Sequence, residues 1–235
     1  MRRLGTCWLS VLACVLAAAG CSPERTMPTA SQPRTIHAPI EPPAGPVSPL
    51  HALSLLQYAW VHRDTFQLGL LPSQDFEFVF AASGSPGVGI QGASWGRRDE
   101  LASSRHLFVG GGTPPPADGI ALDFDWNQAS VPLEDPRPGH QNAWHRMIRA
   151  PYSLTVTTRS ATWQIDGVCD FYFVRGDSAA IPPDAVVFPD VPDSSRWWLD
   201  RWEELPAASA NRSGAANRTM PAVAPRWGDL KQLYR

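Results

Sequence analysis

The chain is short of cysteine. Four cysteines occur in 235 residues, and three of them, Cys7, Cys14 and Cys21, lie within the first 21 positions. Only Cys169 remains in the body of the chain, so no internal disulfide can form and a folded domain must be held by its core. Cys169 lies in an apolar run without an adjacent base, which favours a buried strand cysteine over a catalytic thiol.

The chain also lacks a surplus of positive charge. Its formal net charge is −2, from 20 basic and 22 acidic side chains. Nucleic-acid binding needs a positive footprint, so we expect no nucleic-acid partner. The six histidines are scattered without a cluster of cysteine or carboxylate residues. We therefore expect no metal site and no cofactor.

Two glycine-rich motifs overlap in one segment. Residues 87–92 fit the dinucleotide-binding pattern G-x-G-x-x-G, and residues 92–96 fit the nucleophile elbow G-x-S-x-G. The first motif needs βαβ alternation after the loop. The second needs a strand directly before the serine and a helix directly after it. The surrounding sequence provides neither context, so we assign no active site to these residues.

The N-terminal sequence is typical of an export signal. Met-Arg-Arg is followed by an almost wholly apolar run from Leu4 to Ala19. The run is shorter than the roughly 20 residues that a membrane-spanning helix needs. Small residues follow it, as expected before a cleavage site. We therefore interpret residues 1–20 as a signal peptide.

The end of this run carries a more specific pattern. Residues 18–21, Ala-Ala-Gly-Cys, resemble the lipobox of bacterial lipoproteins, in which the chain is cut before a lipid-modified cysteine. The resemblance implies a lipid anchor at Cys21 and a location in the bacterial cell envelope, because several acyl chains hold a protein firmly to a membrane. Ser22 replaces the aspartate that resembles an inner-membrane retention signal, which favours the outer membrane. An ordinary secretory cut after Ala19 is the alternative.

Cleavage would leave 215 residues with a formal net charge of −4, because Arg2 and Arg3 leave with the signal. Residues 21–47 are a Pro-rich tether, with seven prolines in 22–47. In extended form, at about 3.1 Å per residue, the tether would reach roughly 80 Å. We predict one folded domain over residues 48–205, followed by a linker and C-terminal tail over 206–235.

The pattern of the domain predicts an α+β class. Ser48 and Pro49 suit the start of a helix that ends at His62. Further helices are expected at 65–71 and 97–108, and strands at 75–80, 119–126, 152–159, 162–165, 168–175 and 196–203. We interpret Asp166-Gly167 as a tight turn between two strands. Helices followed by a run of antiparallel strands define the class.

Tryptophan is unusually common. Nine would remain after processing, at positions 60, 95, 126, 144, 163, 197, 198, 202 and 227. A core of large aromatic side chains is the simpler interpretation. An apolar pocket lined by some of them is the more specific one. Alternation in the last strand places Trp198 and Trp202 on one face and Trp197 on the other, so both faces should be covered.

The order of elements resembles the nuclear transport factor 2-like superfamily, which includes ketosteroid isomerase and small polyketide cyclases. The resemblance rests on Leu70-Leu71, the Phe-rich strand, residues 95–101 (Trp-Gly-Arg-Arg-Asp-Glu-Leu) and residues 197–202, and it covers about 48–205. Residues 227–231 are similar to a closing segment of exported members. The resemblance implies a cone-shaped, curved antiparallel sheet packed against about three N-terminal helices. It also implies a homodimer formed through the open sheet face.

The resemblance places a candidate pocket inside the cone, lined by Tyr58, Trp95, Asp125, Tyr172 and Trp202. Isomerases of the family use an aspartate base and a tyrosine paired with a protonated acid inside the cone. No carboxylate lies in a motif that matches theirs, so no catalytic residue is assigned. We expect binding of an apolar small molecule or a protein partner without catalysis. The alternative is a lyase or isomerase with a small hydrophobic substrate, which needs a carboxylate of raised pKa beside Tyr58.

Overall fold

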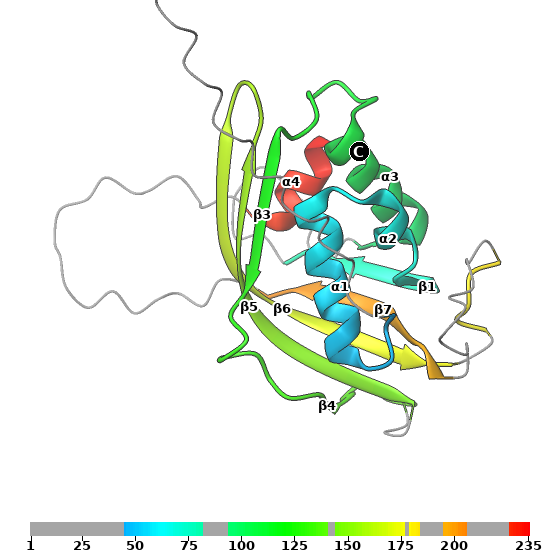
Figure 1. The fold of residues 1–235 in the computed structure, drawn as a ribbon. Coiled ribbons are helices and arrows are strands. Elements are labelled where there is room, and N and C mark those ends of the chain that lie inside the picture. Colours follow the sequence, from blue (N-terminus) through cyan, green and yellow to red (C-terminus); the bar gives the residue numbers. More distant parts are fainter. Residues whose placement is uncertain (1–44, 82–93, 141–143, 177–178, 184–194, 206–225) are drawn as a thin grey trace, which may run out of the picture. The chain divides into compact units, whose positions relative to one another are not determined.

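The computed structural model describes residues 45–81, 94–140, 144–176, 179–183, 195–205 and 226–235. Within them, a seven-stranded sheet has the order β2-β1-β7-β6-β5-β3, and β4 pairs with β5 outside this path. Figure 1 shows the sheet curving around α1, with α2, α3 and α4 on the same side. We call this the concave side. The predicted α+β class is confirmed. The signal peptide, Cys21 and residues 206–225 lie outside the described part of the chain.

The first two helices begin at side-chain caps. α1 spans Pro49–His62 and α2 spans Thr65–Gly69. Ser48 Oγ accepts a hydrogen bond from the His51 amide at 3.2 Å, and Asp64 Oδ1 accepts from the Phe66 amide at 2.9 Å. These bonds satisfy amides that have no partner within the helix. The cap predicted at Ser48 is confirmed.

The third helix follows a short edge strand. β1 spans Pro72–Val79, β2 spans Ser94–Gly96, and α3 spans Arg97–Val109. The sequence predicted β1 only from residue 75 and did not predict β2. The three residues of β2 pair antiparallel with β1 and place Trp95 opposite Phe78. Ser94, from the candidate elbow motif, therefore starts a strand and is exposed.

The prediction of a turn at Asp166-Gly167 is wrong. β5 (His145–Thr157) and β6 (Thr162–Arg175) are long, uninterrupted strands that pair along their whole length. Gly167 lies opposite Tyr152 in this ladder, and a Cβ on it would lie 2.7 Å from the Tyr152 hydroxyl. The glycine therefore makes room for an aromatic ring across the strand pair. The turn lies at 158–161 instead, where Thr158 Oγ1 accepts from the Ala161 amide.

The remaining strands complete the sheet. β3 spans Gly119–Phe124 and pairs antiparallel with β5, which also pairs with the two-residue β4, Leu133–Glu134. β7 spans Trp197–Glu204 and lies between β6 and β1. Its pairing with β6 is antiparallel, as expected, but its pairing with β1 is parallel. The expectation of an antiparallel sheet therefore holds for every strand pair except this one.

An irregularity in β7 changes which tryptophans share a face. The β6–β7 register shifts between Tyr172 and Phe173. As a result, Trp202 belongs to the main core, whereas Trp198 packs with Val174 in a second cluster. A bulge inserts one residue and reverses the alternation beyond it. The expectation that Trp198 and Trp202 share a face was therefore wrong, but both faces of the strand are covered, since Trp197 is 8% exposed and Trp198 0%.

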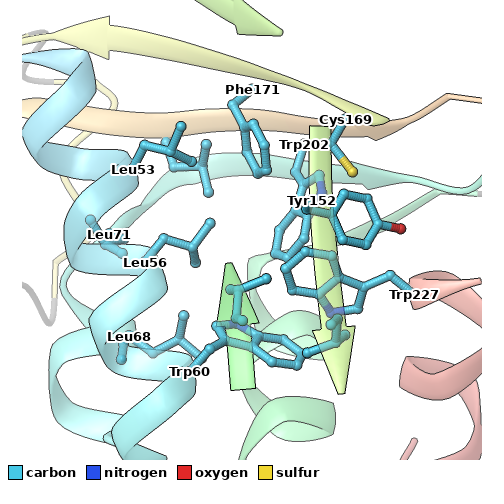
Figure 2. Packing of buried hydrophobic residues seen from close by; sticks show 14 of the residues in the cluster. Leu53, Leu56, Trp60, Leu68, Leu71, Tyr152, Cys169, Phe171, Trp202 and Trp227 are labelled. Atoms are coloured by element: carbon cyan, nitrogen blue, oxygen red, sulfur yellow. The ribbon is translucent and has the colours of Figure 1, made fainter. Parts of the chain in front are cut away.

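The C-terminal segment is part of the core. α4 spans Trp227–Leu233, a helix that the sequence did not predict. Trp227, Leu230 and Tyr234 are each at most 1% exposed and belong to the same buried cluster as α1 and the strands. Figure 2 shows Trp227 against Trp60 and Trp202 at the centre of this cluster. The packed domain thus includes residues beyond 205.

Candidate functional site

The concave side holds a buried ion pair between α3 and α4. Lys231 Nζ lies 2.8 Å from both carboxylate oxygens of Glu100. The two side chains are 1% and 2% exposed. Trp95 Nε1 donates to Oε2 of Glu100 at 3.1 Å, and Ser104 Oγ donates to Oε1 at 3.3 Å. Each carboxylate oxygen therefore accepts one charged and one neutral hydrogen bond.

Aromatic rings surround the ammonium group of Lys231. Its Nζ lies 3.4 Å from the ring centroid of Trp202 and 3.8 Å from that of Phe78. Trp60 and Trp227 lie at 5.8 and 5.7 Å. We call these four residues the aromatic cage. Rings at such distances attract a cation through their negative faces, most strongly where water is excluded.

The cage holds an unusual residue for this chain. Of 20 basic side chains, 19 are arginine, and Lys231 is the single lysine. Burial lowers its pKa from 10.5 to about 8, although the charge of Glu100 opposes the change. Burying two charges is expensive, and an apolar pair of similar volume is often as stable. The buried ion pair is therefore weak evidence for net stability, although loss of either partner alone would leave an uncompensated buried charge.

A second carboxylate holds the start of α4. Glu204 Oε1 accepts a hydrogen bond from the Trp227 amide at 2.9 Å and lies 3.4 Å from the Tyr152 hydroxyl, which donates to it. Burial raises the pKa of Glu204 and that of Tyr152. A Cβ on Gly228 would lie 2.6 Å from Phe80 Cδ1. Only glycine allows α4 to approach the sheet this closely.

Further hydrogen bonds attach the same segment to α3 and to the loop after it. Ser103 Oγ donates to the Lys231 carbonyl at 2.7 Å. His106 Nδ1 lies 2.9 Å from the Tyr234 carbonyl, and the Tyr234 hydroxyl donates to the Pro115 carbonyl at 2.9 Å. Residues 226–235 thus occupy the concave side through a defined set of polar contacts and three large apolar side chains.

The structure brings together two of the five predicted pocket residues. Trp95 and Trp202 both lie at the ion pair, and both pack on Phe78. Tyr58 is half-buried on α1, where its ring lies 4.3 Å from that of His62. The site residues that sequence reasoning missed are Glu100, Glu204 and Lys231.

The other two predicted pocket residues lie elsewhere. Asp125 follows β3 and caps a turn, with Oδ1 accepting from the Asn127 amide at 3.1 Å. Tyr172 pairs with Arg201 across β6 and β7, next to the inward-facing pair of Phe171 and Trp202. Because side chains alternate along a strand, Tyr172 points to the opposite face.

That opposite face carries a row of ion pairs. Arg137 Nη2 lies 2.6 Å from Asp135 and 2.7 Å from Asp200, and its guanidinium lies 4.4 Å over the Tyr172 ring. Burial opposes ionisation of Asp135, but the hydrogen bonds and charge of Arg137 outweigh it and lower the pKa of that carboxyl. Arg149 pairs with Asp170 at 2.7 Å with its side chain 54% exposed.

Cys169 is buried and free, as the sequence predicted. Burial raises the pKa of its thiol. A thiol reacts as the thiolate, so this environment suppresses its reactivity. In the described residues, no group of three or more His, Cys, Asp or Glu side chains could hold a metal ion. The same residues contain no helix that is long and apolar enough to cross a membrane.

No family model matches the sequence, and no curated protein matches it. Solved structures do match. A conserved protein from Planctomyces limnophilus is 16% identical over 66% of this chain and 89% of that chain, with a TM-score of 0.43. A nuclear transport factor 2-like superfamily protein from Salmonella enterica is 11% identical over 70% and 92%, with a TM-score of 0.39. A putative scytalone dehydratase from Novosphingobium aromaticivorans is 14% identical over 66% and 78%, with a TM-score of 0.38.

Proposed function

We propose that the chain is a lipoprotein of the bacterial cell envelope, anchored through Cys21, whose nuclear transport factor 2-like domain is a binding module without catalytic activity. The anchor is supported by the lipobox-like sequence and by the Pro-rich tether after it. Its expected membrane is the outer membrane, and its expected ligand is an apolar small molecule or a protein partner. A homodimer through the open sheet face is part of the same proposal.

One observation carries the binding role. Among the described residues, two buried carboxylates of the concave side could act as acid or base, and α4 engages both: Lys231 pairs with Glu100, and the Trp227 amide donates to Glu204. General acid–base catalysis needs such a group within reach of a substrate. The aromatic cage, in contrast, is buried and surrounds an ammonium group, an arrangement suited to recognising a cation rather than to moving a proton.

The anchor is tested by labelling growing cells with radioactive palmitate. The wild-type chain should label and Cys21→Ala should not. Cys14→Ala is the matched control and should label as the wild type does, because Cys14 leaves with the signal peptide. Label in the Cys21→Ala chain would refute the anchor, and loss of label in Cys14→Ala would show that the substitutions impair export instead.

The binding role is tested by native mass spectrometry of the folded chain with steroid-like and lipid ligands. Tryptophan fluorescence gives a second measurement, because three cage residues are tryptophans. A bound ligand that shifts the fluorescence supports the proposal. If no envelope ligand or partner binds, the proposal falls and a purely structural domain is the better description.

A second candidate is the lyase or isomerase. Glu204 favours it, because this buried carboxylate has a raised pKa and lies 3.4 Å from the Tyr152 hydroxyl. A carboxyl group and a hydroxyl at such a distance could transfer a proton to or from a bound substrate if α4 left the concave side. Turnover of a steroid enone or a small lactone that is lost in Glu204→Gln would support this function over binding alone.

A further inference from the structure

We propose that Glu100 and the three cage residues outside α4, Trp60, Phe78 and Trp202, form a recognition site for a primary alkylammonium ligand, and that α4 holds Lys231 in this site as a displaceable internal occupant. The inference rests on the proposed binding function and specifies its ligand class. The geometry of the ion pair, the composition of the cage and the way α4 is attached each support it.

The geometry selects a primary ammonium group. Two N–H bonds reach the two oxygens of Glu100 at 2.8 Å each, while the faces of Trp202 and Phe78 lie 3.4 and 3.8 Å from the nitrogen. A quaternary ammonium has no N–H to donate to the carboxylate. A neutral alcohol has no charge to pair with it. An aliphatic chain on the ligand would lie against the same rings as the lysine stem.

The docked helix leaves part of the cage unsatisfied. The indole N–H groups of Trp60 and Trp227 are buried and have no hydrogen-bond acceptor among the described residues. A buried donor without an acceptor destabilises the state that buries it. Docking of α4 also removes the charges of Lys231 and Glu100 from water. The unsatisfied indole groups and the desolvated charges both oppose the docking of α4, which its apolar contacts favour.

The attachment of α4 also favours reversible docking. Glu204 and Trp227 are joined by a hydrogen bond of 2.9 Å, although 22 residues separate them in the sequence. So short a distance does not need so many residues. A chain of this length would let α4 leave while the sheet stays unchanged.

The site is tested first by chemical rescue. In Lys231→Ala the alanine keeps Cβ, so n-propylammonium has the size of the missing atoms. We expect n-propylammonium to raise the melting temperature of the full-length Lys231→Ala chain by a few degrees, as a ligand that binds only the folded state does. 1-Propanol, tetramethylammonium and the double variant Glu100→Gln/Lys231→Ala are the controls, and each should show no such rise. Equal melting temperatures with and without n-propylammonium would overturn the proposal.

Displacement is tested in the wild-type chain by hydrogen exchange of residues 226–235. n-Hexylammonium should speed exchange at these residues by several-fold, and 1-hexanol should not. The double variant Glu100→Gln/Lys231→Met keeps a similar volume without either charge, and its exchange should not respond. If Lys231→Ala does not fold, this comparison alone decides. Exchange that n-hexylammonium leaves unchanged in the wild type would overturn the internal-occupant role.

The outcomes separate this inference from the function on which it rests. Binding of an uncharged lipid or steroid without any effect of alkylammonium would refute the ammonium site and retain the binding module. Rescue by n-propylammonium in a chain that binds none of the uncharged ligands would support the site and replace the apolar ligand class by an amine. No response to either class would refute both.

Discussion

Both faces of the sheet carry ion pairs between basic and acidic side chains, but the surroundings of these pairs differ. On the concave side, one ion pair, Lys231 with Glu100, is almost fully buried among aromatic rings. On the opposite face, the ion pair of Arg201 with Glu77 remains partly in water, with side chains 25% and 39% exposed. Exposed pairs contribute little to stability, whereas removing one partner of a buried pair leaves an uncompensated charge. The comparison predicts a steep difference in mutational sensitivity between the faces.

The largest effect is expected for Lys231→Ala. It leaves the Glu100 carboxylate buried without its cation, and the free energy of unfolding should fall by about 3–5 kcal/mol. Urea denaturation measures this change. The double variant Glu100→Gln/Lys231→Met removes both charges, so it should recover most of the loss. A single variant that is no less stable than the double variant would contradict the role of the buried charge.

The next effect is a dependence on alkaline pH that Lys231 gives to the concave side. The pKa of Lys231 is about 8 in the folded chain, against 10.5 for the free side chain. Between these values the unfolded chain binds more protons, so stability should rise with pH, by at most about 1.4 kcal/mol per pH unit.

Urea denaturation across this pH range gives the free energy of unfolding of the wild type and of Glu100→Gln/Lys231→Met. The difference between the two chains reports the contribution of Lys231. Tyr152, whose pKa burial raises, acts with the opposite sign in both chains and cancels. Burial also raises the pKa of Cys169, but its thiol interacts with the charge of Lys231, so the difference reports Lys231 together with this interaction. A difference that stays flat from about pH 8 to 10 would show that Lys231 does not titrate within this window.

Gly228→Ala tests how closely α4 must approach the sheet. The added methyl would overlap Phe80 and lie 2.9 Å from Glu204 Oε2, so we expect a loss of about 1–3 kcal/mol. Gly119→Ala is the matched control, because a Cβ there meets nothing within 4 Å. Thermal denaturation of both variants gives the comparison. Equal melting temperatures would mean that α4 tolerates a shift away from the sheet.

The smallest effect is expected on the opposite face. Glu77→Gln removes one partner of the pair between Glu77 and Arg201, whose side chains are 39% and 25% exposed, so the loss should be about 1 kcal/mol or less. Added salt should reduce it further, because it screens exposed charges. Denaturation at low and high salt checks both statements. A loss as large as that of Lys231→Ala would remove the distinction between the two faces.

Local signals in the sequence predicted the helices better than the details of the sheet. Ser48-Pro49 marks the start of α1 in the sequence itself, because the Ser48 side chain caps a nearby helix amide and Pro49 suits the first helical position. Asp166-Gly167 was misread as a turn, because the reason for Gly167 is the ring of Tyr152, fifteen residues away in the chain. The bulge in β7 likewise follows from its pairing with β6 and leaves no mark in its own alternation.

The site was predicted only in part for the same reason. Trp95 and Trp202 were found because large aromatic side chains indicate a core or a pocket by themselves. Glu100 lies in a run of charged residues that opens a helix, where a solvent-exposed position is the ordinary expectation. Lys231 lies in a tail whose helix is marked only by Trp227, Leu230 and Tyr234 at helical spacing. Only the packing of α4 against α3 brings the two charges together.

The burial of Lys231 gives the protein a built-in reporter. Reagents that modify lysine amines, and proteases that cut only after lysine, have one side-chain target in this chain, and it is 1% exposed. The folded protein should therefore resist amine-directed biotinylation and cross-linking at its side chains. Any such modification at Lys231 would record, molecule by molecule, that the C-terminal helix had left the sheet.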